Sequence, residues 1–258
     1  MKKYILDLTV SYSERITEKY VLLKLTDDHP LPPMRPGQFV EVRVDGSSST
    51  FLRRPISINF VDTVNNELWL LVAVIGDGTR SLSHLQPGCK LNCVLPLGNG
   101  FTMPGGPSDK FLLVGGGVGV APLLYLGAEM HRMGCQPTFL LGARSAADLL
   151  LLDEFNKYGR VCVTTEDGTA GEKGFVTNHS ILGSECFDRI CVCGPKPMMV
   201  AVAGYAHKVG TECEVSLENM MACGVGACLC CVEKTVNGHL CVCKDGPVFN
   251  IKKLLWQV

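Results

Sequence analysis

The chain lacks a charge imbalance of either sign. Its 24 lysine and arginine residues nearly match its 25 aspartate and glutamate residues, so the net charge at pH 7 is −1. Proteins that bind nucleic acid through the phosphate backbone usually concentrate lysine and arginine on one face or in one tail. No such run occurs here, and no segment of the sequence repeats. We therefore expect no nucleic-acid partner.

The chain also lacks an unbroken apolar segment that would suit a signal peptide or a membrane helix. Asp7 interrupts the N-terminal apolar run. Residues 111–128 carry no charge, but their five glycines and Pro122 fit a buried strand, a tight loop and a buried helix better than a membrane span. The 14 cysteines lie in a chain too long for a small secreted disulfide scaffold. We expect a protein of the reducing cytoplasm that contacts no membrane.

The sequence contains two segments with different patterns of expected strands and helices, followed by a cysteine-rich tail. With 258 residues, 47% of them hydrophobic, the chain is large enough for more than one packed domain. Short runs of β-branched and aromatic residues, separated by turn signals, fill the first hundred residues. These expected strands cover 3–12, 20–25, 38–44, 56–60, 68–75 and 91–95, with one short helix at 79–85. Six short strands in this length predict a small antiparallel barrel.

Strands and helices alternate after a linker at 104–109. The expected strands cover 111–114, 137–141, 161–165, 189–193 and 214–217, and the expected helices cover 121–133, 147–158 and 197–209. This alternation predicts a parallel sheet with helices on both faces. The fold class is therefore multidomain β plus α/β, with a six-stranded antiparallel barrel at 1–103, a parallel-sheet domain at 104–212 and a small C-terminal module at 213–258.

The tail carries six closely spaced cysteines. Cys223, Cys228 and Cys231 have the spacing C-x4-C-x2-C, and further cysteines follow at 241 and 243. This is the plant-type spacing of a 2Fe–2S cluster, in which a short loop supplies three thiolates and a distant segment supplies the fourth. The glycines between the cysteines let the loop curl tightly, so that its amides can point at the cluster.

The spacing alone leaves two points open. Four thiolates also bind zinc, although zinc loops usually repeat a C-x2-C pair. The fourth ligand is ambiguous as well, because Cys241 and Cys243 lie two residues apart and would face the same side of a strand. Cys230 is a further spare thiol.

A glycine-rich segment, Leu113-Val-Gly-Gly-Gly-Val-Gly-Val-Ala-Pro122, stands where the first strand of the α/β half should turn into its first helix. Glycine lets the backbone approach a pyrophosphate, and a helix start attracts anions. The segment departs from the standard dinucleotide fingerprint, because Pro122 replaces the third glycine and Arg144, not an acid, follows the second strand. It predicts nucleotide binding and leaves both NAD and NADP open.

Four further motifs lie at the ends of expected strands or helices. Arg53-Arg54 precedes the strand at 56–60, and an arginine pair can hold a phosphate. Gly76-Asp-Gly-Thr79 opens the short helix. Segments 164–168 and 193–198 follow strands of the α/β half, at the edge where ligands of such sheets bind. From position alone, each motif fits a plain turn or a solvated edge as well as a binding site.

Taken together and in this order, the motifs resemble those of the ferredoxin reductase-like flavoprotein family over nearly the whole chain. The matching segments are Pro36-Gly37-Gln38-Phe39, Arg54-Pro55-Ile56-Ser57, Gly78-Thr79, Gly115 to Pro122, Cys193-Gly194-Pro195 and the tail ending in Cys243-Lys-Asp-Gly-Pro-Val-Phe249. The resemblance implies a barrel that binds FAD, a domain that binds NAD and a module that holds a 2Fe–2S cluster.

The resemblance also implies which residues bind each cofactor, and it implies no catalytic acid or base. The FAD residues would be Arg54, Pro55, Ile56 and Ser57, then Leu71, Val72 and Ala73 on the following strand, and Gly78 and Thr79 at the phosphates. The nicotinamide nucleotide would contact Gly115, Gly116, Gly117, Gly119 and Pro122, with Gly194 and Pro195 near the nicotinamide. The iron ligands would be Cys223, Cys228, Cys231 and Cys243, where the resemblance and not the spacing selects Cys243.

Members of the family with such a cysteine tail serve as electron transfer subunits. The resemblance implies a partner subunit that carries FMN and oxidises dihydroorotate to orotate, in a heterotetramer with two copies of each subunit. It implies an electron path from that FMN through the cluster and FAD to NAD+ in pyrimidine (UMP) biosynthesis. The alternatives are a reductase subunit of a sulfide dehydrogenase or ferredoxin:NADP+ oxidoreductase-type complex and, without redox activity, a zinc-stabilised binding module.

Overall fold

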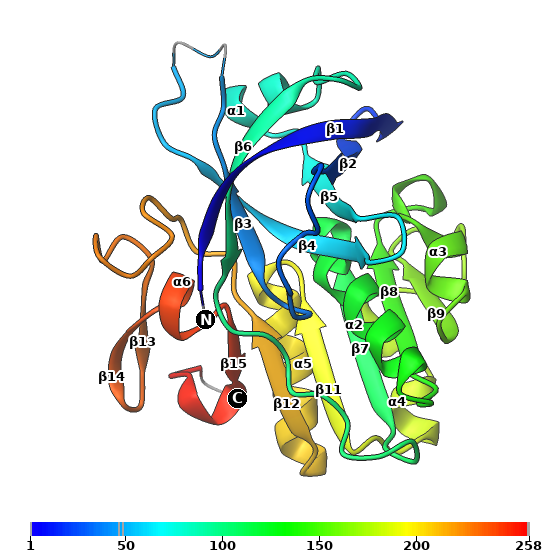
Figure 1. The fold of residues 1–258 in the computed structure, drawn as a ribbon. Helices are drawn as coiled ribbons and strands as arrows, with labels where there is room; N and C mark the ends of the chain where they lie inside the picture. Colours follow the sequence, from blue (N-terminus) through cyan, green and yellow to red (C-terminus); the bar gives the residue numbers. More distant parts are fainter. Residues whose placement is uncertain (1, 46, 48, 257–258) are drawn as a thin grey trace. The chain divides into compact units, whose positions relative to one another are not determined.

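The computed structural model describes residues 2–45, 47 and 49–256, and the chain divides into two compact units (Figure 1). The first unit comprises Met1–Gly100, Glu218–Glu233 and His239–Pro247. The second unit comprises Phe101–Leu217, Lys234–Gly238 and Val248–Val258. The tail beyond residue 217 therefore contributes to both units.

A closed barrel with the strand order β1-β2-β5-β4-β3-β6 forms the body of the first unit. Its strands are β1 (Tyr4–Thr17), β2 (Tyr20–Thr26), β3 (Phe39–Val42), β4 (Arg54–Asp62), β5 (Glu67–Ala73) and β6 (Lys90–Leu97). Every neighbouring pair is antiparallel. The predicted six-stranded antiparallel barrel is thus confirmed, and each strand overlaps the segment expected for it.

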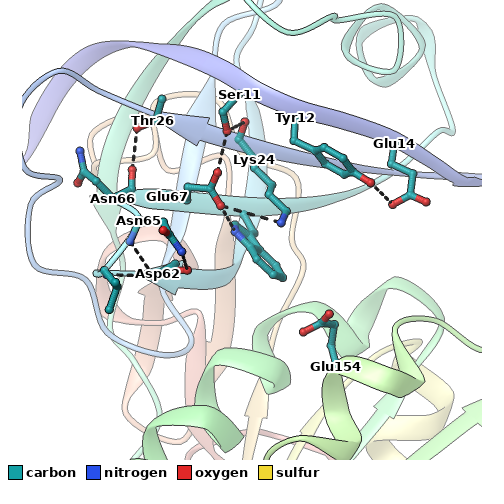
Figure 2. A network of polar contacts seen from close by, with 12 residues as sticks. Ser11, Tyr12, Glu14, Lys24, Thr26, Asp62, Asn65, Asn66, Glu67 and Glu154 are labelled. Carbon is teal, nitrogen blue, oxygen red and sulfur yellow. Dashed lines mark hydrogen bonds and ion pairs between the residues drawn. The ribbon is translucent and has the colours of Figure 1, made fainter.

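Alternating side chains fill the barrel and leave polar residues to pair with one another at its surface. Leu23, Leu68 and Leu70 are fully buried. Glu67 accepts hydrogen bonds from Ser11 Oγ (3.1 Å) and from the indole nitrogen of Trp69 (3.1 Å), as Figure 2 shows for its labelled side chains. Glu67 and Trp69 thus share one face of β5 and Leu68 and Leu70 share the other, as period-two alternation requires.

The tail segments of the first unit are held by backbone hydrogen bonds. The short helix α6 (Val242–Asp245) begins where Val242 N donates to Cys231 O at 3.1 Å. Asn99 Nδ2, just after β6, donates to the carbonyls of Lys244 (3.0 Å) and Asp245 (3.1 Å). These bonds fix α6 against the loop 218–231 and the end of β6. The other short helix of this unit, α1 (Asp77–Leu82), begins two residues before the helix expected at 79–85.

The second unit is built on a seven-stranded sheet with the order β10-β9-β8-β7-β11-β12-β15. The strands are β7 (Phe111–Gly116), β8 (Thr138–Ala143), β9 (Arg160–Thr165), β10 (Glu172–Lys173), β11 (Arg189–Cys193), β12 (Glu212–Ser216) and β15 (Val248–Asn250). All pairs are parallel except β12 with β15. Every residue of the central strand β7 is buried, as expected for a strand covered on both faces.

The helices of the second unit are α2 (Ala121–Arg132), α3 (Leu152–Asn156), α4 (Ile181–Ser184) and α5 (Lys196–Val209). The reading of residues 111–128 as strand, loop and helix is confirmed by β7 and α2. The helix expected at 147–158 forms only in its later part, because a 3-10 turn at Ala146–Asp148 is followed by Leu151 with φ +55°. A left-handed residue cannot continue a right-handed helix, so α3 starts only at Leu152.

In the tail, β13 (Val232–Thr235) and β14 (Gly238–Cys241) form a hairpin. Cys241 ends β14, whereas Cys243 lies within α6. The expectation that strand alternation would put both thiols on one face is therefore wrong, because the strand ends between them. Among the described residues, no helix combines the length and apolarity that a membrane crossing requires.

Candidate functional site

The loop 218–231 surrounds the first cysteine with backbone amides. Cys223 Sγ accepts hydrogen bonds from the amides of Val225 (3.5 Å), Ala227 (3.3 Å) and Cys228 (3.4 Å). Burial acts to raise the pKa of the Cys223 thiol, but the amides of Val225 and Cys228 outweigh it and lower the pKa to about 6. The loop thus favours the thiolate, which is the form that binds metal.

The four cysteines expected as ligands lie in two contacting pairs. The amide of Cys228 donates to Cys223 Sγ at 3.4 Å, which places these two cysteines together. The amide of Cys243 also donates to Cys231 Sγ at 3.4 Å. Burial, followed by the neighbouring Cys231, raises the pKa of the Cys243 thiol to about 12.

This pairing has a chemical meaning. Among the described residues, no three His, Cys, Asp or Glu side chains converge on one point that could hold a single metal ion. Two pairs of thiols instead suit a two-iron cluster, in which each iron takes two cysteine sulfurs. Four cysteine sulfurs are therefore a donor set that fits a 2Fe–2S cluster.

The two spare thiols of the tail lie apart from these pairs. Cys241 Sγ lies 4.0 Å from the carbonyl oxygen of Gly226, and its backbone amide donates to Asp245 Oδ2 at 2.8 Å. Cys230 is exposed. Of the candidates for the fourth ligand that the spacing left open, Cys243 bonds to the Cys231 sulfur, through its backbone amide.

The structure brings Arg54, Gly78 and Thr50 together at one end of the barrel. A Cβ on Gly78 would lie 2.9 Å from Arg54 Nε and 3.1 Å from Thr50 Cγ2, so only glycine admits this approach. The Arg54 guanidinium donates to the carbonyls of Leu52 (3.0 Å) and Arg53 (3.2 Å) and has no carboxylate partner among the described residues. The Arg54 guanidinium therefore lies beside a backbone turn, and this arrangement suits the binding of a phosphate.

Thr79, expected at the phosphates, shapes this turn. Its hydroxyl accepts hydrogen bonds from the amides of Ile75 (2.9 Å) and Gly76 (3.1 Å). It also donates to the Gly76 carbonyl at 3.1 Å. The Thr79 side chain is thus engaged by its own backbone and holds the turn that carries Gly78.

The remaining flavin candidates lie on β4 and β5. Because these strands are antiparallel with Ile58 opposite Leu70, the start of β4 and the end of β5 lie at the same end of the barrel. The start of β4 holds Pro55, Ile56 and Ser57, and the end of β5 holds Leu71, Val72 and Ala73. Leu71 and Val72 are buried, so their backbone and not their side chains could reach a ligand.

In the second unit, the glycine loop and the segment after β11 pack directly together. A Cβ on Gly119 would lie 2.4 Å from Gly194 Cα, and a Cβ on Gly116 would lie 2.6 Å from Met198 Sδ and 3.4 Å from Pro195 Cδ. Because β7 and β11 are parallel neighbours, both segments lie at the carboxyl edge of the sheet. This is the edge where nucleotides bind in such folds.

The other glycine-loop residues have separate roles. A Cβ on Gly115 would meet Val120 and Leu123, so this glycine serves the packing of β7 on α2. Gly117 begins a 3-10 turn with φ +56°, and Pro122 is buried in the first turn of α2. The segment 164–168 is bonded to the two residues that follow it, since Thr165 Oγ1 bonds to Ala170 and Asp167 accepts hydrogen bonds from Thr169.

Sequence reasoning missed Glu41, the one acidic residue of β3. It is 1% exposed, and neither carboxylate oxygen has a hydrogen-bond partner among the described residues. Burial raises its pKa to about 7, although the charges of Arg53 and Arg54 act to lower it. The signal was present in the sequence, as a glutamate inside the apolar run Phe39-Val-Glu-Val42.

The chain is similar to known proteins in both sequence and structure. Residues 218–255 match the family model "iron-sulfur cluster binding domain of dihydroorotate dehydrogenase B", and residues 113–204 match "oxidoreductase NAD-binding domain". A chain in the solved structure of an NADH-dependent reduced ferredoxin-NADP oxidoreductase is 29% identical, with a TM-score of 0.87 over 97% of this chain and 90% of that chain. A ferredoxin reductase of carbazole 1,9a-dioxygenase, 19% identical with a TM-score of 0.67 over 82% of this chain and 67% of that chain, shares the fold.

These matches confirm the ferredoxin reductase-like fold and the expected cofactors, which are FAD, 2Fe–2S and NAD. Two relatives are similar over almost their full lengths. The dihydroorotate dehydrogenase B (NAD(+)) electron transfer subunit of Listeria monocytogenes serotype 4b is 40% identical, over 95% of this chain and 96% of its own. That of Fusobacterium nucleatum is 36% identical, over 94% of this chain and 95% of its own. The chain belongs to the family of electron transfer subunits of dihydroorotate dehydrogenase B (NAD(+)).

Proposed function

We propose that the chain accepts electrons from an FMN-containing catalytic subunit that oxidises dihydroorotate to orotate, and delivers them to NAD+ in pyrimidine (UMP) biosynthesis. The observation that carries this proposal is the pairing of four tail cysteines, Cys223 with Cys228 and Cys231 with Cys243, each pair joined by an amide-to-sulfur hydrogen bond of 3.4 Å. The same chain contains a reductase-type barrel and a nucleotide-binding sheet. The relatives named above carry the corresponding name.

The proposed binding residues follow the geometry. FAD is held by Arg54, Pro55, Ile56 and Ser57 on β4, by the backbone of Leu71, Val72 and Ala73 on β5, and by Gly78 with Thr79 at the turn. NAD is held by Gly115, Gly116, Gly117, Gly119 and Pro122 together with Gly194 and Pro195. The cluster is held by Cys223, Cys228, Cys231 and Cys243. The proposed domain limits are 1–103 for FAD, 104–212 for NAD and 213–258 for the cluster.

Each part of the chain has a defined task in this reaction. When bound, the flavin exchanges hydride with nicotinamide and single electrons with the cluster, which neither of the other two groups can do alone. The Arg54 guanidinium compensates the charge of a phosphate, and Gly78 leaves space for the Arg54 side chain. The cluster loop stabilises thiolates through its amides. No side chain is needed as a general acid or base.

The proposed assembly contains two copies of this chain and two copies of the catalytic subunit. We place it in the cytoplasm, because the exposed thiols of Cys89, Cys186 and Cys230 suit a reducing compartment. A second function is favoured by one observation. The likeness to a chain of the reduced ferredoxin-NADP oxidoreductase, at 29% identity, fits a reductase subunit that serves a ferredoxin-type partner.

Copurification separates these functions. The chain is expressed with a candidate catalytic subunit under anaerobic conditions, and reduction of NAD+ is followed at 340 nm with dihydroorotate as the only electron donor. The proposal expects NAD+ reduction that depends on both subunits. If ferredoxin or sulfide supports NAD+ reduction and dihydroorotate does not, the chain would instead be assigned to the second function.

A further inference from the structure

Glu41 is a buried carboxyl group that the cofactor-binding residues leave unexplained. It lies in β3, with both neighbouring strand residues also buried, and both of its oxygens lack hydrogen-bond partners among the described residues. A buried unpaired carboxylate costs several kcal/mol of stability, so such a group in a folded protein often marks a functional site. Glu41 is therefore the strongest candidate for a functional residue outside the cofactor-binding residues named above.

The groups nearest to Glu41 in the barrel do not satisfy its side chain. Arg53 Nη1 donates to the backbone carbonyl of Glu41 (3.2 Å) and to that of Asn92 (3.0 Å). The other end of the guanidinium donates to the side-chain oxygen of Asn92. Arg53 thus places positive charge near the carboxyl without bonding to it.

The Glu41 side chain instead faces the cluster loop. A Cβ on Gly224 would lie 2.7 Å from Glu41 Cγ and 3.2 Å from Glu41 Oε1. Gly224 has φ +66° and directly follows Cys223. Both the backbone angle and the close approach demand glycine at this position. The carboxyl group consequently lies directly against the loop that supplies three of the four thiols.

The positive charge of Lys244, which also lies near this loop, is more exposed than the Glu41 carboxyl group. A Cβ on Gly226 would lie 2.8 Å from Cδ of Lys244, whose side chain is exposed to solvent. Water and salt screen an exposed ammonium group strongly, whereas a buried carboxylate is screened much less. Glu41 therefore has a larger effect than Lys244 on a group bound at the loop.

We propose that Glu41 is a positioning residue that lowers the reduction potential of the 2Fe–2S cluster, through its negative charge against the cluster loop at Gly224. Reduction adds an electron to a cluster that is already anionic, so a fixed negative charge nearby disfavours the reduced form. The charges of Arg53 and Arg54 support ionisation of Glu41. The proposal rests on the cluster ligation given under the proposed function.

The test is a potentiometric titration of the cluster, followed by electron paramagnetic resonance at pH 8.5 on anaerobically purified protein with its cofactors bound. We expect Glu41→Gln to retain the iron and FAD content of the unsubstituted protein and to shift the cluster midpoint to higher potential. Glu41→Asp, which keeps the charge, should stay closer to the original value than Glu41→Gln. Glu14→Gln is the matched control, because Glu14 is exposed on β1 and accepts a hydrogen bond from Tyr12 (Figure 2).

The outcomes separate the possible roles of Glu41. A cluster midpoint in Glu41→Gln that moves no more than in Glu14→Gln would overturn the proposal. Loss of the cluster in both Glu41→Gln and Glu41→Asp would also overturn it, in favour of a purely structural role. Unsubstituted protein without any cluster signal would refute the proposed ligation itself, whereas a normal cluster with an unmoved potential refutes only the role of Glu41.

Discussion

Arg53 and Arg54 are neighbours in the sequence, but their side chains contact different groups. Arg53 binds the carbonyls of Glu41 and Asn92 inside the barrel, whereas Arg54 lies over Gly78 at the proposed phosphate site. The sequence pair alone could not separate the two, because both precede the same strand. Only the family resemblance selected Arg54.

A matched pair of substitutions tests this division. Arg54→Leu should weaken FAD binding roughly 10- to 100-fold, since a charge-assisted hydrogen bond contributes about 1.5–3 kcal/mol. Its apoprotein should unfold at nearly the original urea concentration. Arg53→Leu should lower the free energy of unfolding by about 1–3 kcal/mol, because it removes the guanidinium donor of the buried side-chain oxygen of Asn92. Fluorescence titration with FAD and urea denaturation measure the two effects, and a reversed pattern would refute the assignment.

The cysteine ligands give a second test at the residue scale. Cys228→Ser removes one member of the first thiol pair, so the protein should lose the cluster and keep its FAD. Electron transfer from the partner subunit should then fail. The visible spectrum and the dihydroorotate-dependent reduction of NAD+ report the two effects. Cys89→Ser is the control, because Cys89 is exposed and lies outside the tail. Unchanged NAD+ reduction by the Cys228→Ser complex would contradict the proposed role.

At the scale of elements, period and turn signals located the barrel strands and the main strands of the parallel sheet. They failed where one residue decides the local structure, as at Leu151, whose left-handed backbone breaks the expected helix. They also failed for strands of two or three residues, such as β10 and β15, which exist only because a neighbouring strand pairs with them. The contact of Glu41 with Gly224 could not be predicted either, because the two residues lie far apart in the sequence.

The glycine loop gives a prediction at this scale. Gly119→Ala puts a methyl group 2.4 Å from Gly194 Cα, so one of the two backbone segments must shift. We expect a raised KM for NADH and a loss of about 1–3 kcal/mol in the free energy of unfolding. Gly204→Ala in α5 is the control, because its added Cβ meets nothing within 4 Å. That substitution should stabilise the helix by about 1 kcal/mol. Equal KM values in the two variants would refute the expected contact.

At the scale of the whole molecule, the barrel and the parallel sheet have cores of their own that do not depend on the tail cysteines. Leu23 and Leu70 fill the barrel, and Leu112 and Phe139 lie in the sheet. Removal of the cluster by a chelator and an oxidant should therefore leave both folded. NADH oxidation with ferricyanide, which needs FAD but not the cluster, should persist after this treatment. Loss of that activity along with the iron would show that the parts are not independent.

The central claim is that the tail thiols hold two irons in a chain that also binds FAD and NAD. The most direct measurement is the iron and acid-labile sulfide content of anaerobically purified protein, together with the resonance spectrum of its reduced form. We expect about two irons and two sulfides per chain and the spectrum of a reduced 2Fe–2S cluster. Colourless protein that contains zinc, or neither iron nor sulfide, would contradict the account.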